Sequence, residues 1–192
     1  LFNSEPLFQN VQFIANQASL FNSGGGAVYI RTEDANLEPR FIGCLFEQNS
    51  ARAGGAVANV GTATTFTGCV FRNNTATIEG GAIRDDSNGN EVVLIANSVI
   101  CGNSLPQIVG DPDENGNEIS DECTTGACCL DEVTCDDSAA FGEMYALTCS
   151  GIAGEFTPGA ACTDAPCIPC EGDYNGDGVV DVSDLLFVIA AW

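Results

Sequence analysis

The chain has 192 residues, a formal net charge of −22 and no His. Its five basic residues are scattered Arg, which form no basic face for phosphates, so nucleic acid is excluded as a partner and anionic membranes are disfavoured. No apolar run reaches about 18 residues, so we expect no transmembrane segment, and the 11 Cys favour an oxidising, extracellular compartment.

A repeated pattern organises the first half of the chain. Each copy carries two apolar residues followed by an Asn, and three of the four copies continue to Gly-Gly-Ala. The members are Phe8, Phe13 and Asn16; Phe41, Phe46 and Asn49; Phe66, Phe71 and Asn74; and Ile95, Ile100 and Asn103. The four Asn lie 33, 25 and 29 residues apart, a period typical of repeat architectures. Since the chain starts within the first copy, we expect it to be a piece of a longer protein or a processed form.

The local pattern within each copy favours strands. Phe, Ile, Val and Cys recur in short alternating runs, and Gly and Asn interrupt them every few residues. We therefore predict a mainly β protein in which residues 1–108 form a single-stranded parallel β-helix of about four rungs. Equivalent residues should stack about 4.8 Å apart, as two apolar ladders and one Asn ladder.

The turns of each rung are predicted from Asn and Gly. We expect each ladder Asn to adopt the left-handed conformation at a bend and to bond through its side-chain amide to the next Asn. The Gly-Gly pair supplies a second bend, and the following Ala fits where the wall approaches the core. The variable segments 31–39 and 84–91 are polar, so we predict loops there.

Cys44 and Cys69 occupy equivalent positions of neighbouring rungs. A disulfide between them is one interpretation, and two buried thiols that act as small hydrophobic residues are the other. Stacked residues keep their Cβ atoms about 4.8 Å apart, which is longer than the 3.5–4.5 Å of a disulfide. This distance favours the thiols.

Residues 109–122 read as an acidic capping loop or linker, because Pro106 interrupts the repeat. A Cys101–Cys123 bridge could fasten this loop over the open end of the solenoid. The loop is also a second, weaker calcium candidate, with the alternating ligands Asp113, Asn115, Asn117 and Asp121. A register from Asp111 through Gly116 to Glu122 fits as well, and a solvated linker is the alternative.

Residues 123–170 form a Cys-rich segment with few aromatic residues. A module of this size needs disulfides as staples. With Cys101, the disulfide candidates are Cys123, Cys128, Cys129, Cys135, Cys149, Cys162 and Cys167. The sequence does not choose among the 15 connectivities that six Cys allow. Zinc is a weaker alternative, because only Cys167 and Cys170 have ligand-like spacing.

Residues 171–192 carry the clearest metal motif. Oxygen donors stand at positions 1, 3, 5, 9 and 12 of a loop with Gly at position 6, and position 7 offers a backbone carbonyl, as in an EF-hand. The predicted calcium ligands are Asp173, Asn175, Asp177, Val179, Asp181 and Asp184. An acidic turn that binds nothing is the alternative. The apolar residues 185–192 should form the following helix and be buried.

Several segments resemble known families. The Phe-x-x-Asn-x-Ala…Gly-Gly-Ala rungs of about the first 105 residues resemble the repeats of polymorphic outer-membrane proteins and related secreted right-handed β-helix proteins. This resemblance implies a right-handed helix and a bacterial, surface-exposed, adhesin-like role. Residues 113–123 resemble thrombospondin type-3 calcium repeats. Residues 173–192 resemble one unit of a type I dockerin, which implies calcium and a cohesin-like partner, although only one of the usual two units is present.

Two functions agree with these features. The first is a non-catalytic secreted or cell-surface structural or adhesive β-helix protein, with a dockerin-like calcium-binding attachment module. The alternative is a fragment of a polysaccharide lyase or glycoside hydrolase tethered through that tail. Such enzymes need a base or paired carboxylates across a groove. Arg84, Asp85 and Asp86 are the best local candidates, but they also fit an acidic loop with one compensating Arg, so we assign no catalytic residue. The expected partners are a cohesin-like or cell-surface protein and a polysaccharide.

Overall fold

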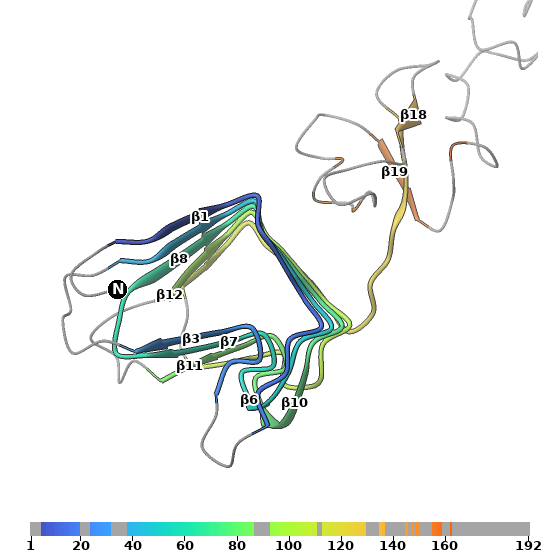
Figure 1. Cartoon of the computed structure of the whole chain (residues 1–192). Coiled ribbons are helices and arrows are strands. Elements are labelled where there is room, and N and C mark those ends of the chain that lie inside the picture. Colours follow the sequence, from blue (N-terminus) through green and yellow to red (C-terminus); the bar gives the residue numbers. More distant parts are fainter. Residues whose placement is uncertain are drawn as a thin grey trace, which may run out of the picture. The chain divides into compact units, whose positions relative to one another are not determined.

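The structure is a computed structural model (Figure 1). It describes residues 5–19, 24–31, 38–86, 93–110, 113–129, 135–136, 145, 147, 149, 155–158 and 162. The chain divides into two compact units, Leu1–Cys123 and Thr124–Trp192, which are treated separately. The described part is mainly β, and the predicted calcium loop and its helix at 171–192 lie outside it.

The first unit coils through three parallel sheets. The first sheet contains β1 (Leu7–Gln9), β4 (Arg40–Ile42), β8 (Thr64–Thr67), β12 (Val93–Ala96) and β15 (Asp113–Asn115). The second contains β2 (Gln12–Ile14), β5 (Leu45–Glu47), β9 (Val70–Arg72), β13 (Val99–Cys101) and β16 (Glu118–Ser120). The third contains β3 (Val28–Arg31), β7 (Val57–Val60), β11 (Ile83–Asp85) and β14 (Ile108–Val109). A short sheet pairs β6 (Ser50–Ala53) with β10 (Thr75–Glu79).

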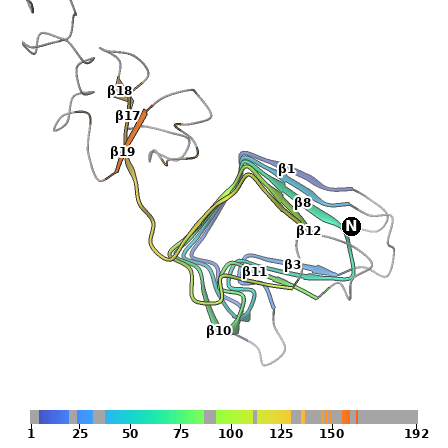
Figure 2. The ribbon, with the colours of Figure 1, turned by 180° about the vertical axis from the view of Figure 1, so that it is seen from behind.

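Successive circuits of the chain stack on one another, as Figure 1 shows, and this arrangement fits the predicted parallel β-helix. We call each circuit a rung and residues 5–123 the solenoid. The short sheet lies at the corner between the second and third sheets (Figures 1 and 2).

The solenoid is longer than the four rungs that the repeat predicts. Strands β14, β15 and β16 pair in parallel with β11, β12 and β13, so the segment predicted as a capping loop or linker builds a fifth rung. The repeat is hidden there because the register places Glu114 beside Ile95 and an exposed Ile119 beside Ile100. A terminal rung has a solvent-facing side, so polar residues replace the core pattern.

The two predicted apolar ladders are confirmed. Rings stack along the first ladder from Phe8 through Phe41 to Phe66, with centroids 4.8 and 4.9 Å apart. The second ladder runs from Phe13 through Phe46 to Phe71 at 4.8 and 4.6 Å. Ile95 and Ile100 continue the two columns in register. Each buried aromatic pair adds about 0.5–1.5 kcal/mol beyond the area it buries, so the stacks are a major part of the core.

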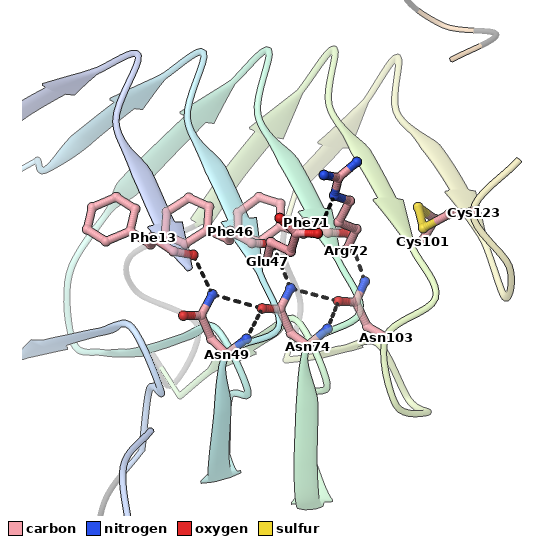
Figure 3. A network of polar contacts seen from close by, with 10 residues as sticks. All are labelled: Phe13, Phe46, Glu47, Asn49, Phe71, Arg72, Asn74, Cys101, Asn103 and Cys123. Atoms are coloured by element: carbon pink, nitrogen blue, oxygen red, sulfur yellow. Dashed lines mark hydrogen bonds and ion pairs between the residues drawn. A yellow bond between two sulfur atoms is a disulfide. The ribbon is translucent and has the colours of Figure 1, made fainter. Parts of the chain in front are cut away.

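The predicted Asn ladder is also present, with one correction. Asn74 Oδ1 accepts hydrogen bonds from Asn49 N at 2.9 Å and Asn49 Nδ2 at 3.0 Å, and the same pattern links Asn74 to Asn103 (Figure 3). Asn16 is linked to Asn49 in the same way. The left-handed residue, however, is the one before each Asn: Ala15, Gln48, Asn73 and Gly102. The ladder Asn must aim its amide inward, and its neighbour makes the bend.

Gln107 ends the ladder. Its Oε1 accepts from Asn103 Nδ2 at 2.8 Å, and its Nε2 donates to the Ser120 carbonyl at 2.8 Å. A Gln therefore takes the place of a fifth Asn and satisfies the last buried amide, since an unpaired buried polar group would be costly.

The turn between the first and second sheets carries a column of small side chains. Cys44 and Cys69 are free, buried thiols, as predicted. The Cys69 thiol donates to the Thr67 carbonyl at 3.6 Å, and the Ser98 hydroxyl donates to the equivalent Ala96 carbonyl at 3.0 Å. A hydrogen bond with Cys44, together with burial, raises the pKa of the Cys69 thiol, so this group stays protonated at neutral pH.

Disulfides occur in both units. The structure contains the Cys101–Cys123 bridge that we hypothesised, with a Cα–Cα distance of 4.9 Å. In the second unit, β17 (Gly126–Cys129) pairs antiparallel with β18 (Cys135–Asp136) and with β19 (Glu155–Pro158). Cys149 and Cys162 are disulfide-bonded. The strands place Cys128, Cys129 and Cys135 in one sheet, and Cys167 lies outside the described residues.

Candidate ligand groove

The second candidate calcium loop, residues 113–121, has a different role in the structure. Asn117 follows Ser98 in the column of small side chains. Its Oδ1 accepts from Ser98 N at 2.9 Å and its Nδ2 donates to the Ile95 carbonyl at 2.8 Å. Both ends of the amide are therefore used within the wall, and the flanking strands β15 and β16 are extended rather than wrapped around a common point. We assign Asp113–Asp121 to the fifth rung instead of a calcium loop.

Metal-binding clusters are also absent from the rest of the described chain. No group of three or more Asp, Glu, Cys or His side chains suited to a metal occurs in the described ranges. The loop with Asp173, Asn175, Asp177, Val179, Asp181 and Asp184 lies outside them.

The charged and polar side chains around Arg84 form ion pairs and hydrogen bonds within the solenoid. Arg84 Nε lies 3.1 Å from Glu79 Oε1, and its Nη2 lies 3.1 Å from Asp86 Oδ2. Asp85 is buried and accepts from Asn59 Nδ2 at 3.0 Å, while Asn59 Oδ1 accepts from Thr64 Oγ1 at 3.1 Å. The Asp85, Asn59 and Thr64 contacts fix the corner between the third and first sheets and leave Asp85 inside the wall.

An open groove of about 540 Å³ runs over three rungs beside the short sheet. It is lined by Gln17, Ala18, Ser19, Ser50, Ala51, Arg52, Thr75 and Thr77. Gln17 pairs with Ser50, and Ser50 pairs with Thr75, so these three form one column across the rungs. The lining Ala residues are too small to fill the space between the polar columns. The groove therefore offers a row of hydroxyl and amide groups within a lining that is otherwise largely apolar.

Charge sets this groove apart from the rest of the protein. The chain carries 27 acidic residues, yet none is among the described residues that line the groove, where the one charged side chain is that of the exposed Arg52. An exposed guanidinium can bind a carboxylate through two parallel hydrogen bonds. The groove is thus suited to a hydroxylated ligand that also carries a negative charge.

One sequence pattern indicates this groove, although the spacing of the core residues does not reveal it. After the ladder Asn of the first three rungs, the chain reads Gln-Ala-Ser, Ser-Ala-Arg and Thr-Ala-Thr. A polar, Ala, polar triplet at one place in each repeat predicts a polar surface with a recessed centre. None of these residues was among the predicted site residues, because the triplets fall within the variable spacing between Asn and Gly-Gly.

One comparison links the chain to a known repeat. Residues 68–84 match the Chlamydia polymorphic membrane protein repeat. The matched segment runs from the turn before β9 through β9 and β10 into β11, and includes Phe71, Asn74 and the Gly80-Gly81 pair. No curated protein and no solved structure matches the chain. Within the described residues, no helix has the length and apolar character needed to cross a bilayer.

Proposed function

We propose that this chain is a non-catalytic, surface-exposed adhesive protein, built on a right-handed parallel β-helix, whose groove binds an acidic polysaccharide. The groove across three rungs, with its row of hydroxyl and amide groups and with Arg52 as the only charged residue of its described lining, carries the proposal. The polymorphic membrane protein repeat at 68–84 supports a bacterial outer-surface location. A repeated wall of this kind presents polar side chains at the same place of each rung, which suits a ligand that is itself a repeating polymer.

The function is tested by binding and turnover on one polymer. We expect the chain to bind immobilised polygalacturonate, and Arg52→Ala to weaken binding at least about tenfold, because a charge-assisted contact is lost. Arg31→Ala is the matched control, since Arg31 is exposed on the third sheet and the change in net charge is the same. Its affinity should stay within about twofold of wild type. Equal losses in both variants would show a general charge effect and contradict the groove.

Turnover in the same samples separates the adhesive function from the enzymatic alternative. The alternative of a β-helix lyase or hydrolase is not favoured, because Arg84 is held in two ion pairs and Asp85 is buried. We expect neither new reducing ends nor unsaturated products from polygalacturonate. Product formation that is lost in Asp86→Ala would support the enzyme instead.

We further propose that residues 171–192 bind calcium and attach the protein to a cohesin-like or cell-surface protein. The support is the oxygen pattern from Asp173 to Asp184. In titration calorimetry of the whole chain, Asp173→Ala should weaken calcium binding roughly 100-fold, because the site loses one charged ligand. Asp113→Ala is the control and should leave calcium binding unchanged, since Asp113 belongs to the fifth rung. Identical heats from wild type and Asp173→Ala would remove the site.

A further inference from the structure

One disulfide joins the fourth rung to the fifth. Cys101 is the last residue of β13, and Cys123 follows β16 by three residues (Figure 3). The two residues are 22 positions apart in the sequence, and β14, β15 and β16 all lie between them. The bridge therefore closes the whole fifth rung into one covalent loop on the rung before it.

The fifth rung adds little to the apolar core. Its residues in register with Ile95 and Ile100 are Glu114 and Ile119, and Ile119 is 44% exposed. Ile108 packs against the core but is only partly buried. In the second, third and fourth rungs, by contrast, every residue of the two apolar ladders is at most 1% exposed. Hydrophobic stabilisation scales with the apolar area removed from water, so it holds the fifth rung less firmly than these rungs.

Hydrogen bonds and the disulfide hold the fifth rung instead. Its three strands pair with β11, β12 and β13. Asn117 bonds to the backbone of Ser98 and Ile95, and Gln107 Nε2 donates to the Ser120 carbonyl. Each of these bonds stabilises the rung only modestly, because water replaces it when the rung opens. A disulfide that closes a loop of this length shifts the equilibrium toward the closed form about 100-fold.

The two cysteines of the bridge differ in their access to solvent. Cys101 is 1% exposed, whereas Cys123 is half-buried. A thiolate breaks a disulfide by attacking a sulfur that it can reach, and the other sulfur leaves. Cys123 is therefore the position of attack, and Cys101 is the leaving thiol.

We propose that the fifth rung is a redox-controlled cap, closed by the Cys101–Cys123 disulfide and opened by a dithiol reductant. One thiolate of the reductant attacks Cys123 Sγ, the S–S bond breaks, and Cys101 leaves as a thiolate that takes up a proton. The second thiol of the reductant then breaks the mixed disulfide and releases the thiol of Cys123. The bridge gains two electrons and two protons, and the reductant is oxidised to its own disulfide.

Opening the cap changes the end of the fourth rung. Ile95 and Ile100 are fully buried, and Asn103 is 4% exposed where it bonds to Gln107. When the fifth rung leaves, β12 and β13 lose their partners β15 and β16, and these side chains meet water. The aromatic stacks from Phe8 to Phe71 belong to the first three rungs, so the opening is local. The cap is closed in an oxidising compartment and open in a reducing one.

Hydrogen exchange on the whole chain tests the cap strand by strand. In the double variant Cys101→Ser/Cys123→Ser, we expect the amides of β15 and β16 to exchange about 100-fold faster than in the oxidised wild type. The amides of β5 and β9 should stay within about threefold. Unchanged exchange of β15 and β16 would overturn the proposal. Equal acceleration in β5 and β9 would do so too, because the bridge would then support the whole solenoid.

Cys69→Ser is the matched control for the double variant. It also replaces a sulfur by an oxygen, but at a free thiol. Ser98 occupies the equivalent position of the next rung, so the wall accommodates a hydroxyl there. We expect β15 and β16 to exchange within about twofold of wild type. Acceleration as large as in the double variant would show a general effect of Cys→Ser changes and contradict the cap.

Reduction of the wild type supplies a test that needs no variant. Dithiothreitol is the reductant, and alkylation of quenched samples followed by mass spectrometry gives the reduced fraction of Cys101 and Cys123, apart from the disulfides of the second unit. Fast exchange of β15 and β16 should rise in proportion to this fraction and disappear when oxidised glutathione restores the bridge. Full protection of β15 and β16 after complete reduction, or fast exchange after the bridge has re-formed, would contradict a reversible cap.

Discussion

Asn74→Ala is expected to lower the free energy of unfolding by about 4 kcal/mol, because it removes four hydrogen bonds of buried groups. Asn74 is fully buried; its Oδ1 accepts from the N and Nδ2 of Asn49, and its Nδ2 donates to the Phe46 carbonyl and to Asn103 Oδ1. Ala makes none of these hydrogen bonds and leaves the partner groups buried without an acceptor or donor. Urea unfolding followed by circular dichroism measures the change.

The adjoining Asn73 provides the control. It is exposed, and its backbone is left-handed, with a φ of 55°. Asn73→Gly removes an amide of the same size one position away, and Gly adopts this conformation readily, so we expect a change within about 0.5 kcal/mol. If Asn74→Ala lowered the free energy of unfolding by less than about 1 kcal/mol, water would be replacing the lost hydrogen bonds of the ladder. The amides would then not specify how the rungs stack.

Much of the solenoid could be predicted because its core residues repeat. Stacked rungs place equivalent residues in contact, so the period of Phe41, Phe46 and Asn49 carries three-dimensional information that a non-repetitive sequence would not. The ladders, the bonded amides and the buried thiols all follow from that one periodicity.

The structural features that the sequence did not predict lie where the repeat is interrupted or replaced. Gln107 reaches the position of a fifth Asn through a longer side chain, and it falls four residues after Asn103 rather than a full period later. The fifth rung lacks the core Phe, since one side of it faces solvent. The groove depends on which polar residues the short sheet brings side by side, and spacing alone does not give that pairing.

The left-handed residues show a finer limit. Ala15 and Gln48 adopt φ values of 55° and 54° although neither residue favours that region. The neighbouring amide ladder compensates for the strain, so the bend is set by tertiary contacts rather than by local preference. In these two rungs the Asn that follows the bend is used for its hydrogen bonds, whereas in the next rung an Asn, Asn73, itself adopts the left-handed conformation.

Gly55→Ala is expected to cost at least about 3 kcal/mol, because the wall would have to open to admit one methyl group. A Cβ at Gly55 would lie 2.1 Å from the Gly81 carbonyl oxygen and 2.8 Å from backbone atoms of Thr75. These are atoms of the next rung's backbone, so no side chain can rotate away to relieve the contact. A Cβ at Gly26 or Gly81 would likewise lie 2.2 or 2.0 Å from a backbone oxygen of the following rung. The close approach of stacked backbones therefore explains the second Gly of each pair. For Gly55→Ala, calorimetric unfolding should show a large fall in Tm.

Gly68→Ala separates this steric effect from backbone strain. Gly68 has a φ of 60°, yet a Cβ there would meet nothing within 4 Å, so only the left-handed conformation is penalised, by about 1–2 kcal/mol. Gly55 carries the opposite combination, since it is not among the residues with positive φ. Equal losses of unfolding free energy in Gly55→Ala and Gly68→Ala would show that backbone conformation alone selects Gly in these rungs. A much larger loss at Gly55 would show that the distance between stacked rungs depends on a backbone without side chains at this corner.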